Sequence, residues 1–471
     1  MKPLAALVLP AIRWDAERGF APALPAVERD LALGVGGFII FGGERGAVAQ
    51  LTRDLAAGSR HPLLIASDFE RGAGQQVAGL TPLPPAMAVA ALGEDAVAEA
   101  ATITAREARD VGIAWVFAPV VDLDVEPANP IIQTRAFGDD PEAVGRAGAR
   151  WIAACQSAGV LACAKHFPGH GRTTADSHAE LPVVVTPREA LEADLLPYRW
   201  AVGAGVAGVM TAHVAYPGLD PSGVAATHSR PMLDALLRRE LAFDGLVVTD
   251  ALIMEGALQE SGEETGAVRA LQAGCDLLLY PKDVGGVVAA LERGLASGAL
   301  DVQRLDASLA RRLAARERAA EPSRLDDAAL ERHRARARAL AQASVRVLRG
   351  QPQGAPRAVD LVIVDDDAGG PYPVAPRSAF AEELAARGVG LAPGGDRVVL
   401  LFSDVKSWKG RATLSAASRR SLAVALLAPA TVVLFGHPRL LAEIPGPGPV
   451  WCAWSGDAVM QRAAAERLLA G

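Results

Sequence analysis

The sequence predicts an α/β fold in which a (β/α)8 barrel of the TIM type is followed by a smaller α/β sandwich domain. Eight short apolar runs alternate with amphipathic helical segments over roughly the first 300 residues, and the alternation restarts after a linker. Buried strands that alternate with helices are typical of parallel β/α architecture, and eight such units suit a closed barrel. An open doubly wound sheet is the alternative. The eight runs are Leu4–Leu9, Gly37–Phe41, Leu63–Ala66, Ile113–Phe117, Leu161–Ala164, Ala207–Met210, Gly245–Val248 and Asp276–Tyr280.

Polar residues of catalytic type follow most of these runs, among them Asp68, Asp122, Lys165, His213 and Asp250. In a barrel the C-terminal ends of the strands meet at one face, where the active site is built. Because the runs are recognised by their apolar character alone, the polar residues that end them favour the barrel over the open sheet. Between the runs, helices are predicted over 96–111, 141–158, 187–204, 229–240 and 262–273.

The length of 471 residues is too great for one ordinary hydrophobic core, so we expect two domains. The barrel is predicted over residues 1–318. A helical linker follows over 319–357 and includes a charged helix over 326–348. The second domain, 358–471, contains no GxGxxG after a strand and no P-loop, so no nucleotide cofactor is expected. Its predicted elements are strands over 359–364, 397–402, 431–435 and 449–453 and helices over 379–387, 415–427 and 457–469.

The composition limits the partners and the location of the protein. The net charge of −7 is spread over both halves and gives no reason to expect nucleic acid or an anionic membrane as partner. No stretch approaches the ~20 apolar residues of a membrane span. The apolar N-terminus is short and contains two prolines, so we interpret it as a first strand and not as a signal peptide. The four cysteines, which lack CxxC or disulfide-like spacing and fit a reducing, cytoplasmic compartment, are Cys155, Cys163, Cys275 and Cys452.

The densest group of titratable side chains lies between Val160 and Pro182. A buried run ends there in Lys165 and His166, and a Gly/Pro turn with His170 follows. Lys and Arg sum to 47 and only five are Lys, so a lysine at a buried strand end is not an effect of composition. We expect Lys165 and His166 to face the barrel mouth and bind substrate hydroxyls or a carboxylate. A structural ion pair with Asp122 or Asp250 is the alternative.

The loop after this turn carries Asp176 and His178. A histidine two residues after an aspartate suits general acid–base catalysis, since the carboxylate orients the imidazole and raises its pKa. A hydrogen-bonded surface histidine is the alternative. Metal ligation is also conceivable, but zinc-binding histidines usually sit on a helix or on separate strands, and no H-E-x-x-H occurs here. We therefore expect no metal, and the absence of G-x-S-x-G argues against a serine hydrolase.

Asp250 directly follows the buried run Leu246–Thr249. A carboxylate at a strand end is costly to bury unless it is paired or catalytic, so Asp250 is a candidate nucleophile. An N-cap of a helix that starts near Leu252 is the alternative. Asp68 ends the third run, and its carboxylate suits sugar hydroxyls or anchors a loop. Arg135, in a long loop, either binds the substrate or holds the loop to Asp122 or Asp124; we favour the substrate.

Several segments resemble motifs of one known family. Lys165–Gly171 (KHFPGHG) and Thr174–His178 (TADSH) resemble the signature of family 3 glycoside hydrolases of the β-N-acetylglucosaminidase type. Val247–Ala257 (VVTDALIMEGA) is similar to the family's nucleophile segment. Asp68–Gly72 (DFERG) and Arg135–Phe137 (RAF) match more loosely. The motifs are spread over the whole predicted barrel, and the second domain resembles the α/β sandwich of two-domain members.

The resemblance implies a retaining double displacement. Asp250 would be the nucleophile, and His178, oriented by Asp176, would act first as acid and then as base. The sugar would be held by Asp68, Arg135, Lys165 and His166. The implied reaction releases non-reducing terminal β-linked GlcNAc, typically from muropeptides in cell-wall recycling.

The residues leave other activities open. A neutral histidine as acid/base does not repel an incoming anion, which permits a phosphorylase, and a β-glucosidase is a further alternative. A catalytically inactive sugar-binding protein is the alternative outside enzymes. In Arg71-Gly72-Ala73-Gly74-Gln75-Gln76 the sequence departs from single-domain relatives, because Gln76 stands where those carry an arginine. No residue of the second domain is a candidate for the site.

Overall fold

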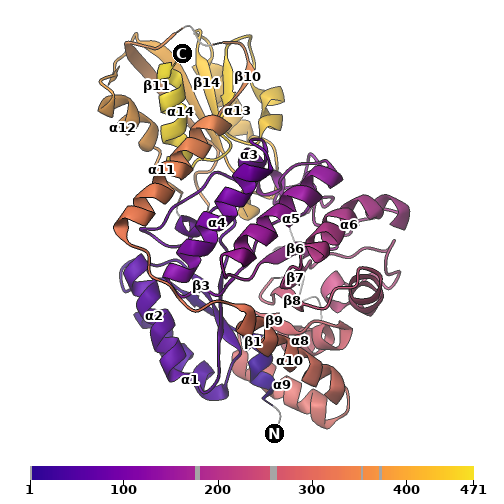
Figure 1. Ribbon diagram of the computed structural model, residues 1–471. Helices are drawn as coiled ribbons and strands as arrows, with labels where there is room; N and C mark the ends of the chain where they lie inside the picture. Colours follow the sequence, from indigo (N-terminus) through magenta and orange to yellow (C-terminus); the bar gives the residue numbers. More distant parts are fainter. Residues whose placement is uncertain (1–2, 176–180, 255–261, 352–353, 371–373, 471) are drawn as a thin grey trace.

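The computed structural model describes residues 3–175, 181–254, 262–351, 354–370 and 374–470. Figure 1 shows a helix-ringed barrel, with the N-terminus at its lower end, and a smaller sheet domain stacked on the barrel's other end. Asp176 and His178 lie outside the described residues. The predicted fold class, a barrel followed by an α/β domain, is confirmed.

The barrel has eight parallel strands in the part of the chain that the structure describes. The first is split by Pro10, which has no N–H for the ladder: β1 (Val8–Leu9) pairs with the last strand and β2 (Ala11–Arg13) with the next. Bridges from Trp115 to Leu161 and from Val120 to Lys165 close the ring between β5 and β6. The others are β3 (Gly37–Phe41), β4 (Leu64–Ser67), β5 (Trp115–Val116), β6 (Cys163–Phe167), β7 (Gly208–Thr211), β8 (Leu246–Ala251) and β9 (Leu277–Leu279).

The start of the first predicted strand is wrong. Leu4–Leu7 forms a 3-10 turn, in which the Ala6 amide donates to the Pro3 carbonyl at 3.0 Å, and all four of its residues are buried. Outer helices cover the barrel, and Asp140 caps one of them by accepting from the Ala143 amide at 2.8 Å. They are α1 (Leu24–Leu33), α2 (Arg45–Gly58), α3 (Ala86–Ala90), α4 (Glu94–Asp110), α5 (Pro141–Ser157), α6 (Arg188–Gly203), a π-type helix at Pro231–Glu240, α8 (Gly262–Ala273), α9 (Val284–Ala296) and α10 (Val302–Arg318).

The second domain is built on a six-stranded sheet with the order β10-β15-β14-β13-β11-β12, in which β10 alone among the described strands runs antiparallel. Helices cover it on both sides (Figure 1). The strands are β10 (Arg346–Arg349), β11 (Ala358–Asp365), β12 (Gly390–Leu391), β13 (Asp396–Ser403), β14 (Thr431–Gly436) and β15 (Val450–Cys452), and the helices are α12 (Ala379–Ala386), α13 (Ala416–Ala425) and α14 (Ala458–Ala470).

The charged helix predicted over 326–348 is shorter than expected. Its counterpart α11 (Asp327–Ser344) starts at the N-cap Asp326, and Val345 is already extended. The next residues form β10, which pairs with β15, because valines at 345 and 347 favour a strand when a sheet edge is available. The boundaries at 318 and 357 stay predictions, since α11 and β10 both lie between them.

The two domains meet at the carboxyl ends of their strands. Asp124, after β5, accepts hydrogen bonds from His437 Nε2 at 2.9 Å and Arg439 Nη1 at 2.8 Å, and both partners follow β14. Arg71, after β4, forms an ion pair of 2.8 Å with Asp457, which follows β15. The carboxyl edge of the second sheet therefore faces the barrel mouth. None of the described helices combines the length and the apolar character that crossing a membrane requires.

Candidate active site

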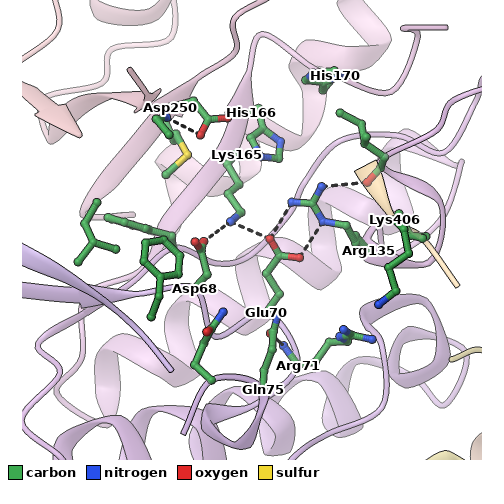
Figure 2. Close-up of a pocket in the computed structure, with 18 of the residues that line it drawn as sticks. Asp68, Glu70, Arg71, Gln75, Arg135, Lys165, His166, His170, Asp250 and Lys406 are labelled. Carbon is green, nitrogen blue, oxygen red and sulfur yellow. Dashed lines mark hydrogen bonds and ion pairs between the residues drawn. The ribbon is translucent and has the colours of Figure 1, made fainter. Parts of the chain in front are cut away.

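A cavity of about 470 Å³ lies at the barrel mouth, where the second domain forms part of its wall (Figure 2). Among the side chains that line it are Asp68, Arg135, Lys165, His166 and Asp250, all of them predicted as site residues from the sequence. Three different strand ends and one long loop supply these five residues. The fold thus brings together residues that are up to 182 positions apart, from 68 to 250.

Lys165 is buried between two carboxylates. Its Nζ lies 2.8 Å from Asp68 Oδ1 and 2.7 Å from Glu70 Oε1. Burial alone would lower the pKa of Lys165, but Asp68 and Glu70 outweigh it and raise the pKa, so the ammonium group stays charged. Asp68 and Glu70 hold Lys165, whereas His166 has one of the alternative partners weighed above, Asp122, at 2.7 Å.

Glu70 lies between Lys165 and Arg135, and Arg135 binds the Glu70 carboxylate through two nitrogens. Arg135 Nε lies 2.9 Å from Glu70 Oε2 and Nη2 lies 2.8 Å from Oε1, and Nη1 donates to the Ile131 carbonyl at 2.9 Å. Burial would raise the pKa of Glu70, but Arg135 and Lys165 together hold it well below its usual range. Arg135 is thus held by Glu70 in place of Asp122 or Asp124. The sequence motif contained Glu70, but its role as the shared partner of two cations was missed.

Asp122 holds the residues at the end of β6. Its Oδ2 lies 2.7 Å from His166 Nδ1, and its Oδ1 accepts from the backbone amides of His166 at 3.1 Å and His170 at 2.6 Å. Burial would raise the pKa of Asp122, but His166 outweighs it and the pKa is lowered. Because Nδ1 faces Asp122, Nε2 is the ring nitrogen of His166 left to meet a ligand.

Two neighbouring residues of β6 face the same cavity at a point where the strand is irregular and the Lys165–His166 peptide bond is cis. Side chains normally alternate between the faces of a strand, yet Lys165 and His166 both line the cavity. The pairing register of β6 with β7 shifts between Lys165 and Phe167. Such irregularities redirect side chains and are frequent beside active sites.

His170, which the sequence made prominent as one of three clustered histidines, has a role in the loop. Its Nδ1 lies 2.8 Å from Thr173 Oγ1, and its carbonyl accepts from Asn129 Nδ2 at 2.9 Å. Burial, with His166 nearby, lowers the pKa of His170 to about 4, so its ring is neutral near pH 7. It also lines the cavity wall.

Asp250 stands at the end of β8, and its Oδ1 accepts from the Ala251 amide at 2.7 Å. The alternative of a helix N-cap is not what the structure gives, because residues 252–254 form a turn and the next described helix begins at Gly262. The carbonyl of Ala251 lies 3.2 Å from His213 Nε2, which steadies the strand end. Asp250 thus lines the cavity from the end of a central barrel strand.

The second domain supplies cavity residues that sequence reasoning missed. Asp404, Val405, Lys406 and Trp408 line it, from the loop that follows β13. The sequence did contain one signal for this loop, because two of the chain's five lysines, Lys406 and Lys409, stand in it. Gln76, the departure from the single-domain pattern, also lines the cavity, and its Oε1 accepts from the Gly42 amide at 3.3 Å.

The described side chains include no group of three or more His, Cys, Asp or Glu placed to hold a metal ion. What the cavity offers is a mixture of fixed donors and acceptors. Lys165 and Arg135 present charge-assisted donors, Asp68 presents an acceptor, and Asp250 adds a carboxylate from the end of β8. Such a set can bind a polyhydroxylated ligand and attack it.

Comparison with known proteins agrees with this geometry. Over 264 residues the chain is 38% identical to a beta-N-acetylglucosaminidase/beta-glucosidase of Cellulomonas fimi, covering 54% of this chain and 47% of that protein. It is 39% identical over 273 residues to a beta-hexosaminidase of Thiobacillus denitrificans, covering 55% and 75%. The chain thus spans about half the length of the first relative and three quarters of the second.

A solved structure extends the similarity over both domains. The structure of a glycoside hydrolase family 3 beta-N-acetylglucosaminidase from Paenibacillus sp. matches with a TM-score of 0.88 and 29% identity, covering 99% of this chain and 96% of that one. The model of the glycosyl hydrolase family 3 N-terminal domain matches residues 26–315, which is most of the barrel. With the strand-end carboxylates and cations gathered in one barrel mouth, this match shows that the chain belongs to glycoside hydrolase family 3.

Proposed function

We propose that the protein is a retaining exo-β-N-acetylglucosaminidase that releases non-reducing terminal GlcNAc. The observation that carries the proposal is the position of Asp250 in the same cavity as Asp68, Lys165, His166 and Arg135. A carboxylate beside several sugar-binding side chains is what a glycosidase needs to attack an anomeric carbon. The names of the similar proteins support GlcNAc as the sugar.

In the first step, Asp250 attacks the anomeric carbon as the bond to the leaving oxygen breaks. His178, oriented by Asp176, donates a proton to that oxygen, and a covalent glycosyl-enzyme forms. In the second step the neutral His178 takes a proton from water, whose oxygen displaces the Asp250 carboxylate. Two inversions leave the anomeric centre as it began.

The remaining side chains hold the sugar. The carboxylate of Asp68 accepts from a hydroxyl, and the ammonium of Lys165 and the guanidinium of Arg135 donate to others. Their mutual ion pairs keep them in place before substrate arrives, so little ordering is needed on binding. His166 offers Nε2, since its Nδ1 faces Asp122.

We propose muropeptides as the natural substrates and cell-wall recycling in the cytoplasm as the setting. Support comes from the motif resemblance of the sequence and from four cysteines that are all buried and unpaired. The expected partner is therefore a small carbohydrate or a muropeptide.

Turnover of p-nitrophenyl β-GlcNAc by the purified protein tests the activity, with p-nitrophenyl β-glucoside as the comparison. NMR should detect β-GlcNAc as the first product, and inorganic phosphate should neither accelerate release nor yield GlcNAc 1-phosphate. A 5-fluoro glycosyl fluoride of GlcNAc should label the peptide that contains Asp250, as read by mass spectrometry. Label on another peptide, or phosphate-dependent product, would contradict the proposal.

A further inference from the structure

Lys406 differs from Lys165 and Lys409 in having only one carboxylate partner, and that partner is distant. Its side chain is 30% exposed, and the nearest carboxylate oxygen, Asp404 Oδ2, is 3.9 Å from its Nζ. Among the residues that the structure describes, no hydrogen bond is made by this ammonium group. Lys165, in contrast, lies within 2.8 Å of two carboxylates. Lys406 therefore presents an ammonium group to the cavity that is available to an incoming anion.

The loop that carries Lys406 is held by buried ion pairs. Lys409 Nζ lies 2.7 Å from Asp367 Oδ1 and 3.3 Å from Asp366 Oδ2, and it donates to the Asp404 carbonyl at 3.1 Å. The Asp404 amide donates to Asp367 at 3.0 Å. These contacts fix the start and end of the loop, so Lys406 is presented from a rigid base.

The position of this loop follows from the sheet topology. In the sheet, β12 lies on one side of β11 and β13 lies on the other. The order in which successive strands are added therefore reverses between β11 and β13. In open parallel sheets, ligands bind outside the carboxyl ends of the strands at such a switch point. Here the switch point faces the barrel mouth, and its loop lines the cavity with Lys406.

The other cations that line the cavity already have anionic partners. Arg135 and Lys165 share Glu70, and Arg71 lies 2.8 Å from Asp457 and 3.6 Å from Asp404. Burial raises the pKa of Asp404 even though Arg71 and Lys406 act against it, which weakens Asp404 as a counter-ion. A negative charge on a ligand would therefore meet Lys406.

The reaction geometry indicates which part of the substrate reaches Lys406. In a double displacement the leaving group departs from the face opposite the nucleophile. Figure 2 shows Asp250 and Lys406 on opposite sides of the site, with Lys165 and Glu70 between them. Trp408 lines the cavity in the same loop, and its indole packs so closely on Gly370 that a Cβ there would lie 2.2 Å from Cε2.

We propose that Lys406 is a specificity-determining residue that binds a carboxylate on the leaving aglycone, with Trp408 as the apolar wall beside it. This inference rests on the proposed glycosidase function and adds the choice of aglycone. Lys406 acts on binding and on orientation of the leaving group, and transfers no proton.

The test compares two substrates that differ in one charge, β-GlcNAc-(1→4)-N-acetylmuramic acid and its methyl ester. The wild type should have a higher kcat/KM for the free acid, and Lys406→Met should lower this preference about 10- to 100-fold, the effect of losing one hydrogen bond to a charged group. Lys406→Arg should keep most of it. Lys282→Met removes an exposed lysine that does not line the cavity and serves as the matched control.

The outcomes separate the inference from the proposed function. If the wild type cleaves neither substrate nor p-nitrophenyl β-GlcNAc, the proposed function fails. If it cleaves both substrates and Lys406→Met leaves their ratio unchanged, only the role of Lys406 is overturned. Inorganic phosphate is the third arm: acceleration of the wild type that is lost in Lys406→Met would mean that Lys406 binds a free anion and not the aglycone.

Discussion

Arg71 of the barrel and Asp457 of the second domain form an ion pair of 2.8 Å between residues that are 386 positions apart. The same guanidinium lies 3.6 Å from the buried carboxylate of Asp404. One arginine thus neutralises two carboxylates of the second domain directly beside the cavity, and domain docking and site shape depend on the same side chain.

Replacing Arg71 should weaken the contact between the two domains and lower the free energy of unfolding. Arg71→Leu leaves Asp404 buried without its main cation, and removal of one partner from a buried pair typically costs about 3–5 kcal/mol. Urea unfolding should show this loss, and KM for p-nitrophenyl β-GlcNAc should rise. Arg18→Leu, which breaks an exposed pair with Asp15, should change stability little. Equal effects of the two variants would contradict the interface role.

Loss of the proposed nucleophile should strongly reduce turnover. Asp250→Ala should reduce kcat for the aryl glycoside by about 10³-fold or more, as removal of a covalent nucleophile does. Added azide should partly restore release and yield the α-glycosyl azide, because it enters from the side that Asp250 vacates. Asp244→Ala, an exposed residue before the same strand, is the control. Survival of activity within a few-fold would show that the nucleophile lies elsewhere.

The carboxylate of Glu70 should make stability depend on acid pH. Its pKa in the folded protein lies well below the ordinary value, so Glu70 contributes stability above about pH 4.5 that is lost as pH falls toward the folded pKa. The free energy of unfolding should therefore fall less between pH 6 and pH 3.5 in Glu70→Gln than in the wild type. Parallel curves for the two proteins would refute this assignment.

Gly171 should tolerate no side chain. A Cβ there would lie 1.7 Å from the Leu123 carbonyl oxygen, which is backbone and cannot rotate away. We expect Gly171→Ala to destabilise the protein by about 3 kcal/mol or more and to lower activity, because it displaces the segment that carries Asp122. Gly203→Ala, in α6 with open space around it, should be neutral or slightly stabilising, as thermal unfolding would show.

Much of the barrel was predictable because its strands are buried on both faces. Gly37–Phe41 and Gly262–Ala273 have the predicted limits, and the motif resemblance led to the right family. Strand ends also pointed to Asp68, Lys165 and Asp250, since parallel strands bring their carboxyl ends together. The roles of the predicted site residues stay proposals.

Other contacts were not predictable from the pattern. The partner of Lys165 depends on the irregular register of β6 and on where Glu70 lies after β4, and neither leaves a periodic signal. Lys406 lines the cavity only because the second domain docks on the barrel. The hydrophobic pattern of each domain predicts its own elements but not how the two domains dock. The strand β10 was missed because its four residues follow a helix of strong helix formers without a break.

Asp122 and Asp124 stand two positions apart and face different domains. Asp124 holds His437 and Arg439, and Asp122 holds the amides of His166 and His170. A local opening at the domain interface that frees Asp124 will loosen the segment that contains Asp122. Hydrogen exchange at those two histidine amides should then report interface opening.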